Sequence, residues 1–156
     1  YQVDGKFQIV HDWVVDRSNK KIYAVTQVNI PKDENKEFVN IIKRFRLPLI
    51  SEGDIIFTNK DVEEDFKVSF PHVLQGGTIR KGKLYLPVGL PAGNENRRGN
   101  ERAIVIVDLK KTKITKIISL QDITKSEPEG AGFWNNKLII YCAPKNIYEF
   151  KLRDLR

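Results

Sequence analysis

The chain has 156 residues, of which 40% are hydrophobic and 30% charged, so it has room for one globular domain and is not disordered in composition. Its net charge of +7 would suit an anionic partner, but the densest basic sites are only pairs, such as Lys20-Lys21 and Arg97-Arg98. We therefore expect no nucleic-acid surface. Because no apolar run reaches about 18 residues, we expect no transmembrane helix.

Short β-rich runs with period-2 alternation dominate the chain, and turn residues such as Lys81-Gly82 and Asn135-Asn136 separate them. In chain order the predicted strands are residues 7–16, 21–29, 39–47, 76–80, 83–88, 102–108, 113–120, 130–134, 137–142 and 147–151. The stretch TNKDVEEDF, residues 58–66, predicts one short helix. Thr58 or Asn59 would cap it, and acidic residues would fill its first turns.

Three stretches of the sequence share one pattern. They are HDWVVDRSNKKIYAV (residues 11–25), LQGGTIRKGKLYLPV (74–88) and EPEGAGFWNNKLIIY (127–141). Gln75-Gly76-Gly77 aligns with Glu129-Gly130-Ala131. His11-Asp12-Trp13 falls on the same three columns if the first turn is two residues longer. The chain therefore reads as three copies of one unit.

The middle copy is the most complete and predicts a four-stranded antiparallel meander. Such units, each opening with a small-residue inner strand, are typical of a β-propeller, because inner strands crowd around a central channel. We therefore predict an all-β fold with about 2.75 blades in one partial propeller domain, residues 1–156. Blade 1 would span about residues 7–70, blade 2 about 71–122 and an incomplete blade 3 about 123–156.

Natural propellers close with about 4–8 blades, so three copies cannot complete a ring. The chain begins at Tyr1 and contains no Met. We therefore expect part of a larger propeller, whose missing blades come from further sequence or from another chain. The alternative is a sandwich of about ten strands, which would explain the alternation but not the repeated glycine-containing opening.

Four stretches carry a resemblance to a known family: FRLPLISEGDIIFTNKDVEEDF, VLQGGTIRKGKLYLPVGLP, RAIVIVDLKKTKITKIISL and EPEGAGFWNNKLIIY. Over nearly its whole length the chain resembles the C-terminal half of uncharacterised six-bladed β-propeller proteins that gut bacteria export, often as lipoproteins. The resemblance implies a propeller and an exported location (periplasm, cell surface or secreted). It implies no particular activity, since fold does not determine function.

In a propeller the starts of the first strands gather at one mouth of the central channel, where a ring of polar groups is a binding-site hypothesis. The candidate binding residues are His11, Asp12, His72, Gln75, Glu127 and Glu129. Most of them have a structural alternative. His11 and Asp12 could form a local pair, Glu127 could be a surface residue before Pro128, and the column of Glu129 could bond a neighbouring blade. Trp13 and Trp134 fit packing between blades better than sugar stacking.

Three functions remain open at this level. The first is a ligand-binding propeller, with a glycan or another small polar molecule as ligand. The second is a glycoside hydrolase or lyase in which Glu129 or Glu127 acts with His11. The third is a protein-interaction scaffold that uses loops such as residues 90–101. We expect no cofactor and no metal ion, and Cys142, the single cysteine, lies in an apolar run that predicts a buried, unreactive thiol.

Overall fold

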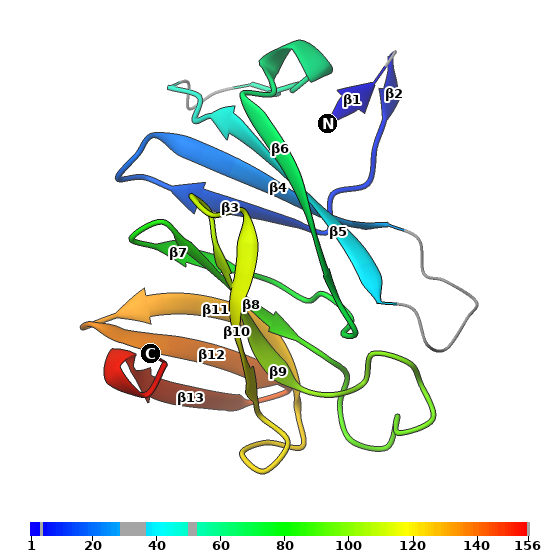
Figure 1. The fold of residues 1–156 in the computed structure, drawn as a ribbon, viewed down its shortest axis with the longest axis vertical. Coiled ribbons are helices and arrows are strands. Elements are labelled where there is room, and N and C mark those ends of the chain that lie inside the picture. The colour runs from blue at the N-terminus through cyan, green and yellow to red at the C-terminus, as the bar shows by residue number, and fades with distance from the viewer. Residues whose placement is uncertain (4, 29–36, 50–52, 156) are drawn as a thin grey trace.

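The structure is a computed structural model that describes residues 1–3, 5–28, 37–49 and 53–155. Within these residues the fold is all-β, with thirteen strands and two short 3-10 turns, η1 (Asn59–Asp61) and η2 (Leu152–Leu155). Three antiparallel sheets stack face to face, and a small hairpin lies beside the first of them (Figure 1). The all-β expectation is confirmed.

Each large sheet is a meander in which neighbours in sequence are neighbours in space. The first sheet contains β3 (Asp12–Asp16), β4 (Lys21–Val28), β5 (Phe38–Arg46) and β6 (Glu64–Phe70). The second contains β7 (Thr78–Arg80), β8 (Lys83–Val88), β9 (Ala103–Asp108) and β10 (Lys113–Ser119). The third contains β11 (Glu127–Trp134), β12 (Lys137–Ala143) and β13 (Asn146–Lys151), and the hairpin pairs β1 (Gln2–Val3) with β2 (Lys6–Phe7).

The central strands of the second sheet, β8 and β9, are buried on both faces. In β9, Val105 and Val107 point into a core shared with the first sheet, whereas Ile104 and Ile106 point into a core shared with the third. Successive side chains of a strand point to opposite faces, so a strand that is covered on both sides is apolar at every position. The unbroken run AIVIV therefore fits a central sheet. Burying each large aliphatic side chain contributes about 1.5–3 kcal/mol.

Two-residue turns connect the first two strands of the second and third sheets. Lys81 and Gly82 have φ of 48° and 71°, and Asn135 and Asn136 have φ of 44° and 65°. Two successive residues with positive φ are the geometry of tight hairpin turns whose twist matches that of the strands, and Gly and Asn tolerate it best. Both turns are predicted by the sequence, and they fix the register of each pair.

The predicted helix over residues 58–66 is wrong. Only η1 is helical, where the Thr58 N–H and hydroxyl both donate to the Asp61 carboxylate at 2.7 Å. The chain then enters β6, which is the fourth strand of the first sheet. There Val68 and Phe70 point inward while Lys67 is exposed, which is period-2 alternation. Packing of this alternating face outweighed the helix-like acidic residues before it.

The predicted strand boundaries differ from the observed ones at the start of each sheet. Residues 8–11 lie outside the strands, so β3 begins at Asp12. In the third sheet β11 already begins at Glu127 and includes Pro128, with an irregular register between Pro128 and Gly130. A proline lacks the N–H that a regular ladder needs, so it is tolerated in an edge strand or at a bulge. The described strands form three face-to-face sheets and a hairpin, not a two-sheet sandwich.

We predict that Gly76→Ala destabilises the fold. A Cβ at Gly76 would lie 2.6 Å from the carbonyl oxygen of Glu129 in the third sheet, and backbone there cannot swing away. Such overpacking costs about 1–3 kcal/mol. The matched control is Gly132→Ala, whose new methyl group meets nothing within 4 Å. Urea unfolding at low protein concentration should show a lower midpoint for the first variant, and an equal loss in both would contradict the close approach.

Candidate functional site

The first strands of the three sheets lie next to one another. β3 contacts β7, β7 contacts β11, and each is an edge strand of its own sheet (Figure 1). The chain segments that lead into these strands are therefore also neighbours. This is where the sequence places its candidate residues, and most of them meet across the boundaries between sheets.

Gln75 and Glu127 are joined directly, although they are 52 residues apart in the chain. The side-chain amide of Gln75 donates to the Glu127 Oε1 atom at 2.5 Å and to the carbonyl oxygen of Gly89 at 2.8 Å. Gln75 precedes β7 and Glu127 opens β11, so the bond ties the second sheet to the third. Both side chains are half-buried, which strengthens a bond to a charged acceptor.

Asp12 lies on the other side of the same segment. Its Oδ2 atom occupies the space beside Gly77, 2.9 Å from where a Cβ would stand. That oxygen is enclosed and has no hydrogen-bond partner among the residues that the structure describes. Burial raises the pKa of Asp12 to about 6, and a hydrogen bond with the Trp13 backbone offsets part of the rise. Asp12 is thus a carboxyl group that titrates not far below neutrality.

The two histidines serve different roles and do not meet. The exposed His11 accepts a hydrogen bond at Nδ1 from the backbone N–H of Gln27, at 3.1 Å. His72 is only 4% exposed, with its Nε2 3.8 Å from a carboxylate oxygen of Glu101. Burial lowers the pKa of His72, with Glu101 opposing the shift, so the ring is neutral at pH 7. Its ring packs against Phe70 of the first sheet.

The side chain of Glu129 is exposed, and it is its backbone that approaches the second sheet. The carbonyl oxygen of Glu129 lies where a side chain at Gly76 would begin. The column that holds His11, Gln75 and Glu129 in the sequence alignment thus supplies contacts between sheets at two of its three positions. The third, His11, bonds within its own sheet.

Sequence reasoning missed a polar cluster around Gln27 and Asn40. The Gln27 amide donates to Asn40 Oδ1 at 3.2 Å and to the His72 carbonyl oxygen at 3.0 Å. Asn40 is fully buried and donates to the carbonyl oxygen of Phe38 at 3.1 Å. This cluster holds the chain where it leaves the first sheet. On the inward face of β5, Asn40 lies between Phe38 and Ile42. A polar residue at such a position was the sequence signal that could have revealed this cluster.

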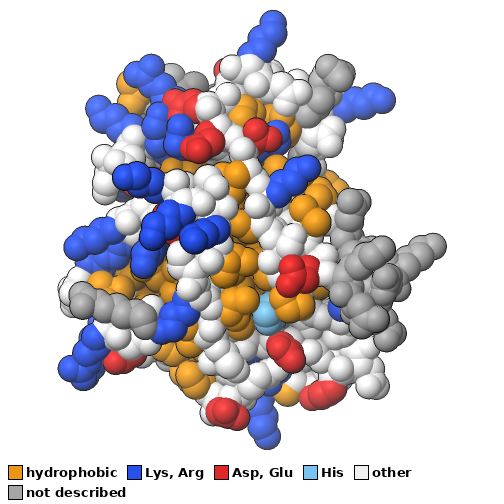
Figure 2. Space-filling model, in the orientation of Figure 1, with side chains coloured by type: hydrophobic (Ala, Val, Ile, Leu, Met, Phe, Trp, Pro, Cys, Tyr) orange, Lys and Arg blue, Asp and Glu red, His pale blue; other side chains and the backbone are white. Residues whose placement is uncertain are grey.

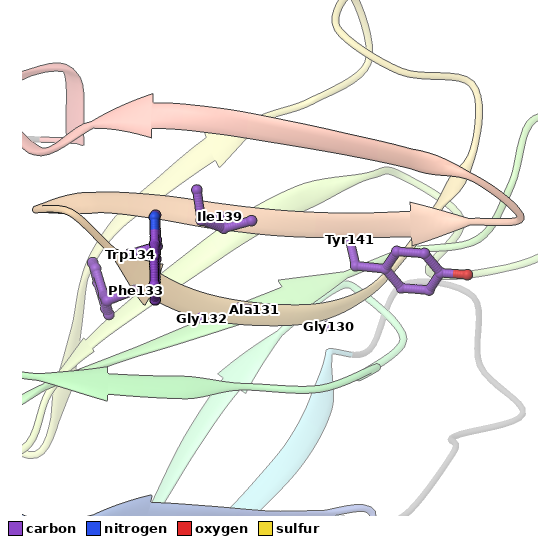
Figure 3. A pocket seen from close by; sticks show the side chains of 7 residues that line it. All are labelled: Gly130, Ala131, Gly132, Phe133, Trp134, Ile139 and Tyr141. Atoms are coloured by element: carbon purple, nitrogen blue, oxygen red, sulfur yellow. The ribbon is translucent and has the colours of Figure 1, made fainter.

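The larger hollows lie away from these residues. One, of about 420 Å³, is shallow and lies on the third sheet, where Trp134, Ile139 and Tyr141 border the glycine-containing part of β11 (Figure 3). Another, of about 370 Å³, is polar and lies against the loop of residues 95–101. In that loop the Arg98 guanidinium stacks on the Phe38 ring, 4.9 Å from its centre. Neither hollow is lined by the candidate residues.

Several expectations concern other chemistry. Cys142 is a free, fully buried cysteine, as predicted, and burial raises the pKa of its thiol. Among the described residues, no group of three or more His, Cys, Asp or Glu side chains could hold a metal ion. No helix there is long and apolar enough to span a membrane. Lys and Arg side chains are scattered on the face in Figure 2, with acidic side chains between them.

No family model and no curated protein matches this chain. Among solved structures it is similar to the crystal structure of the computationally designed Ika4 protein, with 9% sequence identity and a TM-score of 0.44. The match covers 96% of this chain and 95% of that one. At this TM-score the similarity supports no inference about fold or function.

We predict that Asp12→Asn stabilises the fold, and that the gain in stability over the native protein grows as the pH rises. Below about pH 4 the carboxyl is protonated in both the folded and unfolded states, and above about pH 6 it is charged in both. Burial opposes the charged form, so the native protein loses stability relative to the variant as pH rises between these values. We expect a difference of roughly 1–2 kcal/mol after allowing for partial exposure. Chemical unfolding at pH 3.5, 5 and 8 measures it.

The exposed Asp122→Asn variant is the matched control for the loss of one negative charge. Burial lowers the pKa of His72, but this residue is present in both proteins, so its contribution cancels in the comparison. A stability difference between the native protein and Asp12→Asn that stays constant from pH 3.5 to 8 would contradict the raised pKa.

We predict that Gln27→Ala destabilises the fold by about 1–3 kcal/mol, because buried acceptors on Asn40 and His72 lose their donor. Combined with Asn40→Ala, the loss should fall short of the sum by about 0.5–1.5 kcal/mol, since the two side chains share one bond. Thermal or urea unfolding of the four proteins measures this coupling. The exposed Gln8→Ala is the control, and strict additivity of the two losses would argue against the cluster.

Proposed function

We propose that this chain is a partial β-propeller that acts as a non-catalytic binding module for a small polar ligand, with a sugar as the leading candidate. The ligand would lie at the starts of the inner strands, in contact with Gln75 and Glu127 and close to Asp12. The observation that carries the proposal is the placement of two carboxyl groups on opposite sides of residues 75–77. Asp12 stands against Gly77, and Glu127 is bonded to Gln75.

The chemistry of these groups suits hydroxyl donors. An ionised carboxylate is an acceptor with two oxygens, and Gln75 occupies Oε1 of Glu127. Oε2 is then the atom that would accept from a ligand hydroxyl. Because Gln75 is itself held by the Gly89 carbonyl, the carboxylate is fixed before a ligand arrives, which reduces the entropy cost of binding. A row of such groups across sheet boundaries supports binding more than bond cleavage.

One observation favours hydrolysis as the second candidate. A carboxyl group with a pKa near 6, such as Asp12, is suited to act as a general acid, and glycoside hydrolysis uses it with a second carboxylate such as Glu127. Against this, the Oδ2 atom of Asp12 is enclosed by protein, where it could not reach a substrate oxygen. A hydrolase in which His11 acts with Glu129 lacks support, because the structure describes no contact between these two side chains.

The proposed location is outside the cytoplasm, as in the exported propeller proteins that the sequence resembles. This part rests on the resemblance alone. Fractionation of cells that express the protein would test it directly.

Amide chemical-shift titration with a panel of neutral and N-acetylated sugars tests the binding proposal. We expect saturable shifts near Gln75 and Gly77, and about tenfold weaker affinity in Glu127→Gln, which loses a charge-assisted bond worth about 1.4 kcal/mol. Glu129→Gln is the matched control, with the same change on the exposed side chain two residues away. Equal affinity in both variants would contradict the site. Release of reducing ends that is abolished by Asp12→Asn would instead establish the hydrolase.

A further inference from the structure

The outer face of the third sheet carries exposed apolar side chains beside the ion pair of Lys137 and Glu149. Trp134 is 70% exposed, Ile147 67% and Tyr141 40%. On the opposite face of the same strands, Ala131 and Leu138 pack against the second sheet. Figure 3 shows Ile139 and Tyr141 of β12 beside the part of β11 that contains Gly130 and Gly132, where β11 carries no side chain on this face. We call the face formed by Gly130, Gly132, Trp134, Ile139, Tyr141 and Ile147 the outer face of the third sheet.

The glycines of β11 leave open space on this face. Gly76 and Gly130 are equivalent in the sequence repeat. At Gly76 a Cβ would lie 2.6 Å from the third sheet's backbone, so glycine is needed there because the next sheet is so close. At Gly130 the nearest atom is the Cβ of Tyr141, 4.0 Å away in the same sheet, and Gly132 has nothing within 4 Å. Glycine weakens a strand unless a close approach requires it.

The first sheet presents the corresponding face at the other end of the stack, where the rings of Tyr1 and Phe57 already cover Phe45 and part of Trp13. In the repeat, Trp13 is equivalent to Gly77 and Ala131, and those two residues face the preceding sheet. Trp13 has no preceding sheet and is 38% exposed, with Val15, two residues on, 42% exposed. Val14 between them points into the core with the second sheet. Trp13 and Val15 therefore mark the outer face of the first sheet. The equivalent faces of the second and third sheets are buried against the sheets that precede them.

We propose that the outer face of the third sheet docks on the outer face of the first sheet of a second copy of this chain, and that two copies close a ring. The contact continues the two sheet-to-sheet interfaces already present, since it joins the same two faces of the repeat. Such a head-to-tail contact forms a closed ring when its rotation allows. Two copies of three sheets each give six, within the range of about 4–8 found in propellers.

The test is the oligomeric state of the 156-residue chain in sedimentation equilibrium, from about 1 to 200 µM in about 0.15 M salt. We expect a dimer. Gly132→Glu blocks one face and Val15→Glu the other, and each should weaken association by about a hundredfold or more. Both sites have room for the new side chain in the single chain, since nothing lies near Gly132 and Val15 is partly exposed. Circular dichroism verifies that both variants fold.

Mixing the two variants separates head-to-tail contact from other arrangements. In a dimer of either variant alone, one of the two faces in every contact is blocked. In an equimolar mixture, the intact first-sheet face of Gly132→Glu can bind the intact third-sheet face of Val15→Glu. The dimer should therefore return. Ser69→Glu, which adds the same charge at an exposed position of β6, is the control and should dimerise normally. The proposal is overturned by a monomeric native chain at 200 µM, by normal dimers of Val15→Glu, by a mixture that stays monomeric, or by open polymers.

Discussion

Burial of the second sheet on both faces is the constraint on which the rest of the structure depends. β8 and β9 have no side that faces water, so each alternate residue belongs to one of two separate cores. The first and third sheets bury their inner apolar faces against this central sheet. The chain segments that lead into and out of the second sheet must therefore form hydrogen bonds with groups of the neighbouring sheets. Polar groups left unpaired there would cost free energy.

The candidate site follows from this requirement. Gln75 and Glu127, which lie at the starts of the first strands of the second and third sheets, are also the side chains that join these two sheets. Gln27 and Asn40 pair within the first sheet, and Gln27 also binds the His72 carbonyl oxygen in the segment that follows this sheet. Asp12 is the exception, since its Oδ2 atom is enclosed without a partner and its charge is opposed by burial. A buried carboxylate that weakens the fold is where a function is most reasonably sought.

The stack also has two ends, and they differ in how they are protected. At the first sheet, Phe57 packs against Trp13 and Phe45, with ring centres 5.4 and 4.6 Å apart, so part of the outer face is covered. At the third sheet, the apolar side chains and the glycine-containing strand face outward with no cover among the described residues. Exposed apolar faces of this kind mark interaction surfaces or aggregation hazards. The repeat makes a defined interface the better explanation.

The sequence by itself determined the β character, the repeat, and the turns at Lys81-Gly82 and Asn135-Asn136, because alternation and turn chemistry are local properties of the chain. The helix prediction from the sequence failed at residues 64–66. The acidic residues there resembled a helix start, although Phe66 begins the inward face of β6. Tertiary structure alone decided which residues meet across the sheet boundaries: Gln75 with Glu127, and Asp12 with Gly77. These contacts, and the raised pKa of Asp12, depend on how sheets distant in sequence stack, and no local pattern encodes that distance.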